Sequence, residues 1–105
     1  MTVVLKGANT VVAAPDPGGH GGRARLSPFA NPGLASAGTG DVLAGVIVGL
    51  LASASGGEPY EAASLGVYLH GLAAERVREE LGSAGMVASD LLTALPRAMK
   101  ELRGE

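Results

Sequence analysis

The residue types best suited to chemistry gather at Gly38-Thr39-Gly40-Asp41, where Asp41 is the single charged residue between Leu26 and Gly57. Glycines at 38 and 40 allow backbone angles and close approaches that side chains would prevent. A helix that begins here would present unpaired N–H groups and a partial positive charge. Together these features predict a cradle for a phosphate group, with Asp41 as a general base that takes a proton from an attacking hydroxyl.

A purely structural interpretation of the same residues stays open. An aspartate near a helix start is also a common capping residue, and Gly-Thr-Gly is an ordinary turn. Short glycine motifs are weak evidence by themselves. The uncharged surroundings and the very apolar segment after Asp41 favour the catalytic interpretation without excluding the other.

The elements that must position this motif change from β-like to helical near residue 30. Three short segments are predicted to be strands: 2–6, 10–14 and 23–27. The first two flank a turn-rich loop, which predicts a hairpin. Helices are expected from about 40 to 53, from Glu58-Pro59 onward and from Ser89-Asp90 onward. Pro96 is expected to break or restart the last helix.

Helical spacing predicts which positions face the core. The second helix has its apolar positions at Ala62, Leu65, Leu69, Leu72, Ala73 and Val77, and the third at Leu91, Leu92, Leu95, Met99 and Leu102. The segment 42–52 is so apolar that we expect a helix buried on most sides, yet three short strands can shield little of it. The chain is therefore expected to be the C-terminal part of a larger α/β protein, or to assemble with something.

Composition excludes several classes of protein. The chain has 105 residues, 8 basic and 10 acidic side chains, and only 3% aromatic residues, which argues against nucleic-acid binding. It lacks cysteine, so disulfides and thiolate metal sites are excluded. The longest apolar run, 42–52, falls well short of the roughly 20 residues that cross a bilayer. Because the first residues lack the features of a signal peptide, we expect a cytoplasmic protein without membrane contact.

The run from Asn31 to Gly45 resembles the signature of the ADP/ATP-dependent NAD(P)H-hydrate dehydratases, a family of the ribokinase-like superfamily. Three further stretches agree in the same order: Lys6 to Thr10, Val67 to Ala73, and Ala88 to Pro96. Two departures are small, since Leu34 stands where methionine is common and Ala37 where a further glycine is common. The resemblance covers almost the whole chain.

The resemblance implies a fold and an activity. The fold would be α/β and ribokinase-like, but its C-terminal part only: short antiparallel edge strands followed by three packed helical segments. Residues 1–105 would form the nucleotide-binding and catalytic portion of a single domain whose upstream portion is absent. The activity would repair hydrated NADH or NADPH: ADP or ATP would phosphorylate the ring hydroxyl, and loss of phosphate would restore the dinucleotide.

The resemblance also assigns roles to residues. Asp41 would be the base and would touch the substrate, and the anion hole would comprise Gly38, Thr39 and Gly40. Nucleotide contacts would come from Gly40 and from the loop Lys6, Gly7, Ala8, Asn9 and Thr10. Magnesium would accompany the nucleotide's phosphates, with no metal ligand from the chain itself. The chain would form a homo-oligomer or associate with the missing N-terminal portion.

Other interpretations remain. Lys6 alone reads as a solvated lysine at a strand end, and only the resemblance favours a nucleotide contact. His20 reads as a solvated loop histidine, and His70 as a residue that packs on the second helix with one hydrogen bond. The cradle would equally serve a small-molecule kinase of the same superfamily, acting on a vitamin precursor or sugar. A non-catalytic nucleotide-binding or assembly module also stays open.

Overall fold

The computed structural model describes residues 1–6, 9–19, 21–30, 38–53, 58–82 and 86–105. Three strands precede three helices along the chain: β1 (Val3–Leu5), β2 (Val11–Pro15), β3 (Gly22–Leu26), α1 (Thr39–Ser53), α2 (Pro59–Leu81) and α3 (Ala88–Arg103). This order confirms the expected short antiparallel strands followed by three packed helical segments. No helix within the described ranges is long and apolar enough to span a membrane.

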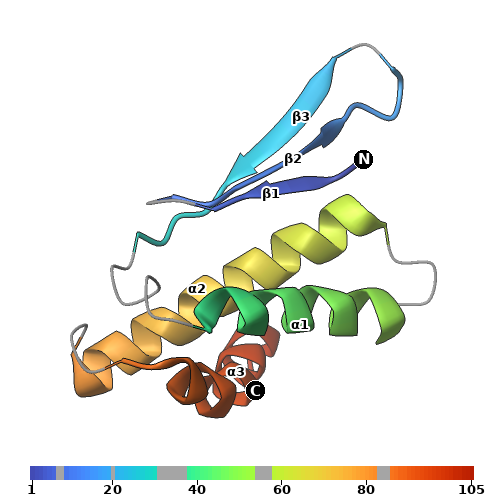
Figure 1. The fold of residues 1–105 in the computed structure, drawn as a ribbon. Helices are drawn as coiled ribbons and strands as arrows, with labels where there is room; N and C mark the ends of the chain where they lie inside the picture. The colour runs from blue at the N-terminus through green and yellow to red at the C-terminus, as the bar shows by residue number, and fades with distance from the viewer. Residues whose placement is uncertain (7–8, 20, 31–37, 54–57, 83–85) are drawn as a thin grey trace.

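The sheet is antiparallel with the order β1-β2-β3, so the predicted hairpin between the first two strands is confirmed. Figure 1 shows all three helices on one face of this sheet. Val12 lies on that face, opposite Val4 on one side and Arg25 on the other, and is almost fully buried. Val12 packs with Leu43 of α1 and Tyr60 of α2, which makes a small core beneath the sheet.

Two arginines of β3 face the helices, where an apolar side chain would be usual. The guanidinium carbons of Arg23 and Arg25 lie 4.1 and 4.7 Å from the centre of the Tyr60 ring. Arg25 also pairs with Glu61 at 2.9 Å, and Arg23 pairs with Glu58. Both guanidinium groups thus lie over the Tyr60 ring and also pair with acids at the start of α2, so β3 is held to that helix.

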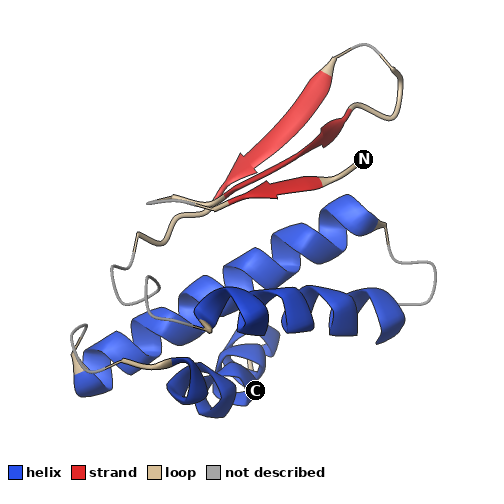
Figure 2. Ribbon diagram, in the orientation of Figure 1, coloured by secondary structure: helices blue, strands red, loops and turns tan. Residues whose placement is uncertain are grey.

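The larger core lies between α2 and α3. Nine buried residues form it: Leu69, Leu72, Ala73, Ala74, Val77, Met86, Leu91, Ala94 and Ala98. The predicted start of α2 is confirmed, with Glu58 at the N-cap and Pro59 in the first turn. Helix α2 is thus the central element, with the sheet above it and the other two helices against it (Figure 2).

The expectation that the apolar helix would be buried on most sides is wrong for this chain. Only Thr39 and Leu43 of α1 are buried, and Val48 is 63% exposed. The reason is geometric: α1 packs against α2 and α3 along one side. No other element among the described residues covers its opposite side.

The expected break at Pro96 is also wrong, because α3 continues through that residue to Arg103. Pro96 lies on the exposed side of the helix, while Ala94 and Ala98 on the buried side continue the contact with α2. Packing therefore outweighs the loss of one helical hydrogen bond. The core-facing positions predicted for α2 and α3 are wrong at three residues, since Leu65, Leu92 and Leu102 are 38%, 59% and 48% exposed.

The start of α3 differs slightly from the expected Ser89-Asp90 cap. The helix begins at Ala88 with Val87 as its N-cap residue. Asp90 caps from inside the first turn, since its carboxylate accepts the Val87 N–H at 2.9 Å. An acidic residue there suits the positive end of the helix.

Candidate phosphate cradle

The first turn of α1 is built on Gly38. This residue has a φ of +88°, and its carbonyl accepts the Val42 N–H at 3.1 Å, which makes it the N-cap residue. A Cβ on Gly38 would stand 3.2 Å from the Cβ of Ala88, at the start of α3. Both the backbone angle and the contact with α3 therefore require glycine here.

The next residues supply backbone donors. Within the described part of the chain, the N–H groups of Gly40 and Asp41 have no hydrogen-bond partner, as expected in a first helical turn. Thr39 is only 2% exposed, so the open surface of the turn belongs to Gly38, Gly40 and Asp41. We call this turn, Gly38 to Asp41, the phosphate cradle.

Lys6 reaches the cradle from the end of β1. Its ammonium occupies the space beside Gly40, where a Cβ would collide with Nζ and would lie 3.6 Å from Cε. Lys6 forms no ion pair with any acid that the structure describes. A cation without a described ion-pair partner thus lies beside Gly40, in the turn whose Gly40 and Asp41 N–H groups have no described acceptor, and this arrangement favours an anion.

Asp41 is exposed in the first turn of α1. Its carboxylate makes no hydrogen bond or ion pair with a described residue, and the N-cap position belongs to Gly38. The geometry therefore gives no support to the interpretation of Asp41 as a side-chain cap. It leaves a solvent-facing carboxylate one residue after Gly40.

His70 of α2 lies beneath the cradle. It is 5% exposed, and its Nε2 lies 2.9 Å from the carbonyl oxygen of Thr39. Since a carbonyl oxygen only accepts, Nε2 carries the proton and donates it. Burial lowers the pKa of His70 from 6.5; the Thr39 hydrogen bond opposes that shift and the Lys6 charge adds to it.

The expectation that His70 packs with one hydrogen bond is confirmed, but its partner could not be foreseen. His70 and Thr39 are 31 residues apart, and no local pattern connects them. Only the packing of α2 against α1 brings them together. The candidate site predicted from the sequence does not include His70.

The loop expected to contact nucleotide is described only in part, because Gly7 and Ala8 lie outside the described residues. The Asn9 side-chain amide donates to the Ser27 carbonyl at 3.2 Å, and the Thr10 carbonyl accepts the Ser27 N–H at 2.8 Å. The end of the loop is therefore fixed to the segment after β3. His20 also lies outside the described residues.

A sequence profile of the NAD(P)H-hydrate dehydratases matches residues 1–97. The chain belongs to this family. It is 45% identical over 103 residues to the bifunctional NAD(P)H-hydrate repair enzyme Nnr of Moorella thermoacetica, covering 98% of this chain and 18% of that protein. The ADP-dependent (S)-NAD(P)H-hydrate dehydratase of Neisseria meningitidis is 45% identical over 94 residues, with coverages of 89% and 29%.

Solved structures agree with the family assignment. The ADP/ATP-dependent NAD(P)H-hydrate dehydratase of Bacillus subtilis, co-crystallised with ATP and Mg²⁺, superposes with a TM-score of 0.82 at 38% identity. The match covers 95% of this chain and 34% of that one. The chain therefore spans between about a fifth and a third of the length of these members of the dehydratase family.

A metal ion in this dehydratase fold would find few protein ligands on the described chain. No group of three or more His, Asp or Glu side chains that could hold a metal occurs among the described residues. The cradle itself offers one carboxylate, that of Asp41, which is too few ligands for a divalent ion. Its N–H groups and the Lys6 ammonium complement phosphate oxygens instead.

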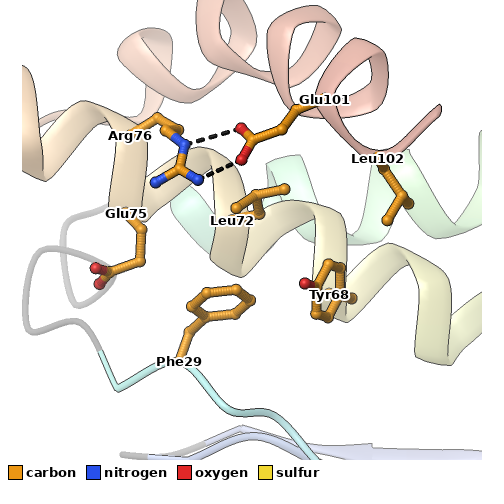
Figure 3. A pocket seen from close by; sticks show the side chains of 7 residues that line it. All are labelled: Phe29, Tyr68, Leu72, Glu75, Arg76, Glu101 and Leu102. Carbon is orange, nitrogen blue, oxygen red and sulfur yellow. Dashed lines mark hydrogen bonds and ion pairs between the residues drawn. The ribbon is translucent and has the colours of Figure 1, made fainter. Parts of the chain in front are cut away.

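A second hollow of about 390 Å³ lies away from the cradle, between α2, α3 and the segment after β3 (Figure 3). Phe29 and Tyr68 meet edge to face in it, with ring centres 5.3 Å apart. Arg76 donates two hydrogen bonds to Glu101 across its rim, so α2 and α3 are linked there. Its charged groups are thus already paired, and we assign it no ligand.

Proposed function

We propose that this chain is the nucleotide-binding and catalytic portion of an enzyme that repairs hydrated NADH or NADPH. ADP or ATP would phosphorylate the ring hydroxyl, and loss of phosphate would restore the dinucleotide. The observation that carries the proposal is that a cation, two backbone N–H groups and a carboxylate gather at one helix start, none of them with a partner among the described residues. The names of the relatives supply the substrate class.

The cradle would bind the phosphoryl group that is transferred. Gly38, Thr39 and Gly40 form the anion hole, and the Lys6 ammonium adds positive charge beside Gly40. Asp41 touches the substrate and takes the proton from its hydroxyl, whose oxygen then attacks the terminal phosphorus as the bond to the leaving nucleotide breaks. The Asp41 carboxylate makes no hydrogen bond with a described residue, so it is available to accept this proton.

The loop Lys6, Gly7, Ala8, Asn9 and Thr10 would line the AMP portion of the nucleotide, with Gly40 close to it. Asn9 donates a hydrogen bond to the Ser27 carbonyl and the Thr10 carbonyl accepts one from the Ser27 N–H, and both support this role because they hold the end of the loop in place. Magnesium would be bound through the nucleotide's phosphates, whose charge it offsets. The chain itself would then contact the phosphate oxygens rather than the metal ion.

The same fold suggests why the chain would not act alone. The sheet face turned away from the helices carries only apolar side chains: Val3, Leu5, Val11, Ala13, Ala24 and Leu26. Together with the open side of α1, this face would associate with the upstream portion of a single ribokinase-like domain or with further copies of the chain. We place the enzyme in the cytoplasm, where a chain without cysteine needs no oxidising compartment.

The test is turnover of hydrated NADH by the chain supplied with the upstream portion of a relative. Asp41→Asn is expected to lower turnover by at least about 100-fold, the usual contribution of a general base, with ADP binding preserved. Asp16→Asn is the matched control, since Asp16 lies in the β2–β3 turn and its Oδ1 acceptor survives the change. Undiminished turnover in Asp41→Asn would overturn the assignment, and phosphorylation without elimination would favour a small-molecule kinase.

A further inference from the structure

The peptide between Thr39 and Gly40 connects two features of the cradle. Its carbonyl accepts the hydrogen bond from His70, and its N–H, that of Gly40, is one of the two unpaired donors. The atoms of a peptide unit lie in one plane, so a hydrogen bond at the carbonyl also sets the direction of the N–H. The peptide lies in the first turn of α1, so the bond from His70 adds to the restraint of the helix itself.

The same hydrogen bond changes the strength of the donor. A carbonyl that accepts a hydrogen bond polarises its peptide unit, and the N–H at the other end becomes a better donor. The effect is greatest away from water, and both Thr39 and His70 are almost fully buried. His70 therefore acts on Gly40 through the peptide, whereas Lys6 lies directly beside Gly40.

We propose that His70 is a positioning residue of the phosphate cradle, which fixes and polarises the Thr39–Gly40 peptide so that the Gly40 N–H is presented to a bound anion. The proposal rests on the proposed function, since the anion is taken to be a nucleotide phosphate. It assigns His70 no contact with the nucleotide or the substrate.

The protonation of His70 fits this role. Burial among the helices and the Lys6 charge both disfavour the imidazolium, and they lower its pKa. A neutral ring with its proton on Nε2 keeps the bond to Thr39 and adds no second cation beneath the cradle. The positive charge at the anion then comes from Lys6 alone among the side chains described.

The test compares the wild-type chain with His70→Gln and His70→Met. Glutamine keeps an N–H donor near the position of Nε2, whereas methionine fills similar space without a donor. One hydrogen bond is worth up to about 1.5 kcal/mol, so His70→Met is expected to bind ADP about tenfold more weakly. His70→Gln is expected to restore most of that loss.

Amide NMR separates positioning from stability. The amide chemical shift of Gly40 is expected to change in His70→Met and to be close to the wild-type value in His70→Gln. The amide chemical shift of Gly45, further along α1, is expected to be the same in all three proteins. Equal ADP affinity in all three proteins, with an unmoved Gly40 resonance, would overturn the role of His70. Absence of ADP binding by the wild-type chain would instead overturn the proposed function, and the Gly40 shift would still report on the peptide.

A measurement on the wild-type chain covers the case in which His70→Met does not fold. The ¹⁵N shifts of the His70 ring report which nitrogen carries the proton. A proton on Nε2 at neutral pH supports the hydrogen bond to Thr39. A proton on Nδ1 alone would remove the donor and overturn the proposal.

Discussion

At the scale of single residues, Gly38 combines two requirements that can be separated by substitution. Gly38→Ala would place a Cβ at a φ of +88° and 3.2 Å from Ala88. We expect it to lower the free energy of unfolding by about 1–3 kcal/mol through backbone strain, and more if α3 must shift. Denaturant unfolding measures the loss.

The control for this change is Gly104→Ala, because Gly104 has a φ of +77° and no atom within 4 Å of the added Cβ. It carries the backbone strain without the contact. A loss for Gly38→Ala no greater than for Gly104→Ala would contradict a role for the Ala88 contact. An unchanged stability would contradict the account of the turn itself.

His70 also predicts how stability depends on pH. Its pKa is lower in the folded chain than the 6.5 of an unperturbed histidine, so the unfolded chain binds the extra proton first. Stability is then complete above about pH 6.5 and falls as the pH drops below it. We expect the melting temperature to fall between pH 7.5 and 5.5 in the wild-type chain, and to fall less in His70→Gln.

Three glutamates that pair with arginines do not interfere in this range. Hydrogen bonds from arginines lower the pKa values of Glu61, Glu75 and Glu101 below 4.5, so their effect on stability begins at a lower pH. His20 is present in both proteins and cancels in the comparison. Identical pH profiles for the two proteins would show that His70 is not buried as described.

The residues of the cradle could be predicted from the sequence because they are adjacent in it. Glycines, a helix start and an acid within four positions define the motif locally. Lys6 is assigned to the site only because the sequence resembles a known family. The place of His70 beneath the site is visible only in the structure. Both reach the cradle through tertiary packing, which leaves no local pattern in the sequence.

At the scale of elements, the contact between α1 and α2 depends on Gly66. A Cβ at Gly66 would stand 2.6 Å from Cγ1 and 3.5 Å from Cα of Ile47. We therefore expect Gly66→Ala to force the helices apart and to cost about 1–3 kcal/mol of stability. Gly45→Ala is the matched control, since its Cβ would meet nothing within 4 Å.

The control is expected to change stability in the opposite direction. Alanine is the better helix former, so Gly45→Ala should stabilise the chain by up to about 1 kcal/mol. Urea midpoints for the two variants and the wild-type chain make the comparison. Stabilisation by Gly66→Ala would contradict the close approach of α1 and α2.

The bounds of most elements could be predicted within one or two residues, since spacing of apolar residues, Pro59 and the glycines mark them locally. Burial could not be predicted equally well. The apolar composition of α1 suggests a helix covered all round, but what covers a helix depends on other elements. Pro96 shows the same limit, because tertiary contacts of α3 outweigh a local signal for breaking it.

At the scale of the whole molecule, the chain has its helices on one face of the sheet (Figure 1). The strand residues on the other face are apolar. The dehydratase relatives are three to five times longer than this chain, judged by the share of their length that it covers. The exposed apolar face and the open side of α1 are where we propose association. The cradle itself is assembled from described parts of this chain.

The central claim is that the chain itself carries a nucleotide-phosphate site, and thermal melting with ADP and Mg²⁺ tests it most directly. A ligand at a hundredfold excess over its dissociation constant should add about 2.7 kcal/mol of stability to the wild-type chain. We expect Lys6→Met to lose most of this gain, and Lys100→Met, a change at an exposed lysine of α3, to keep it. A cooperative melt that ADP does not shift would contradict the claim.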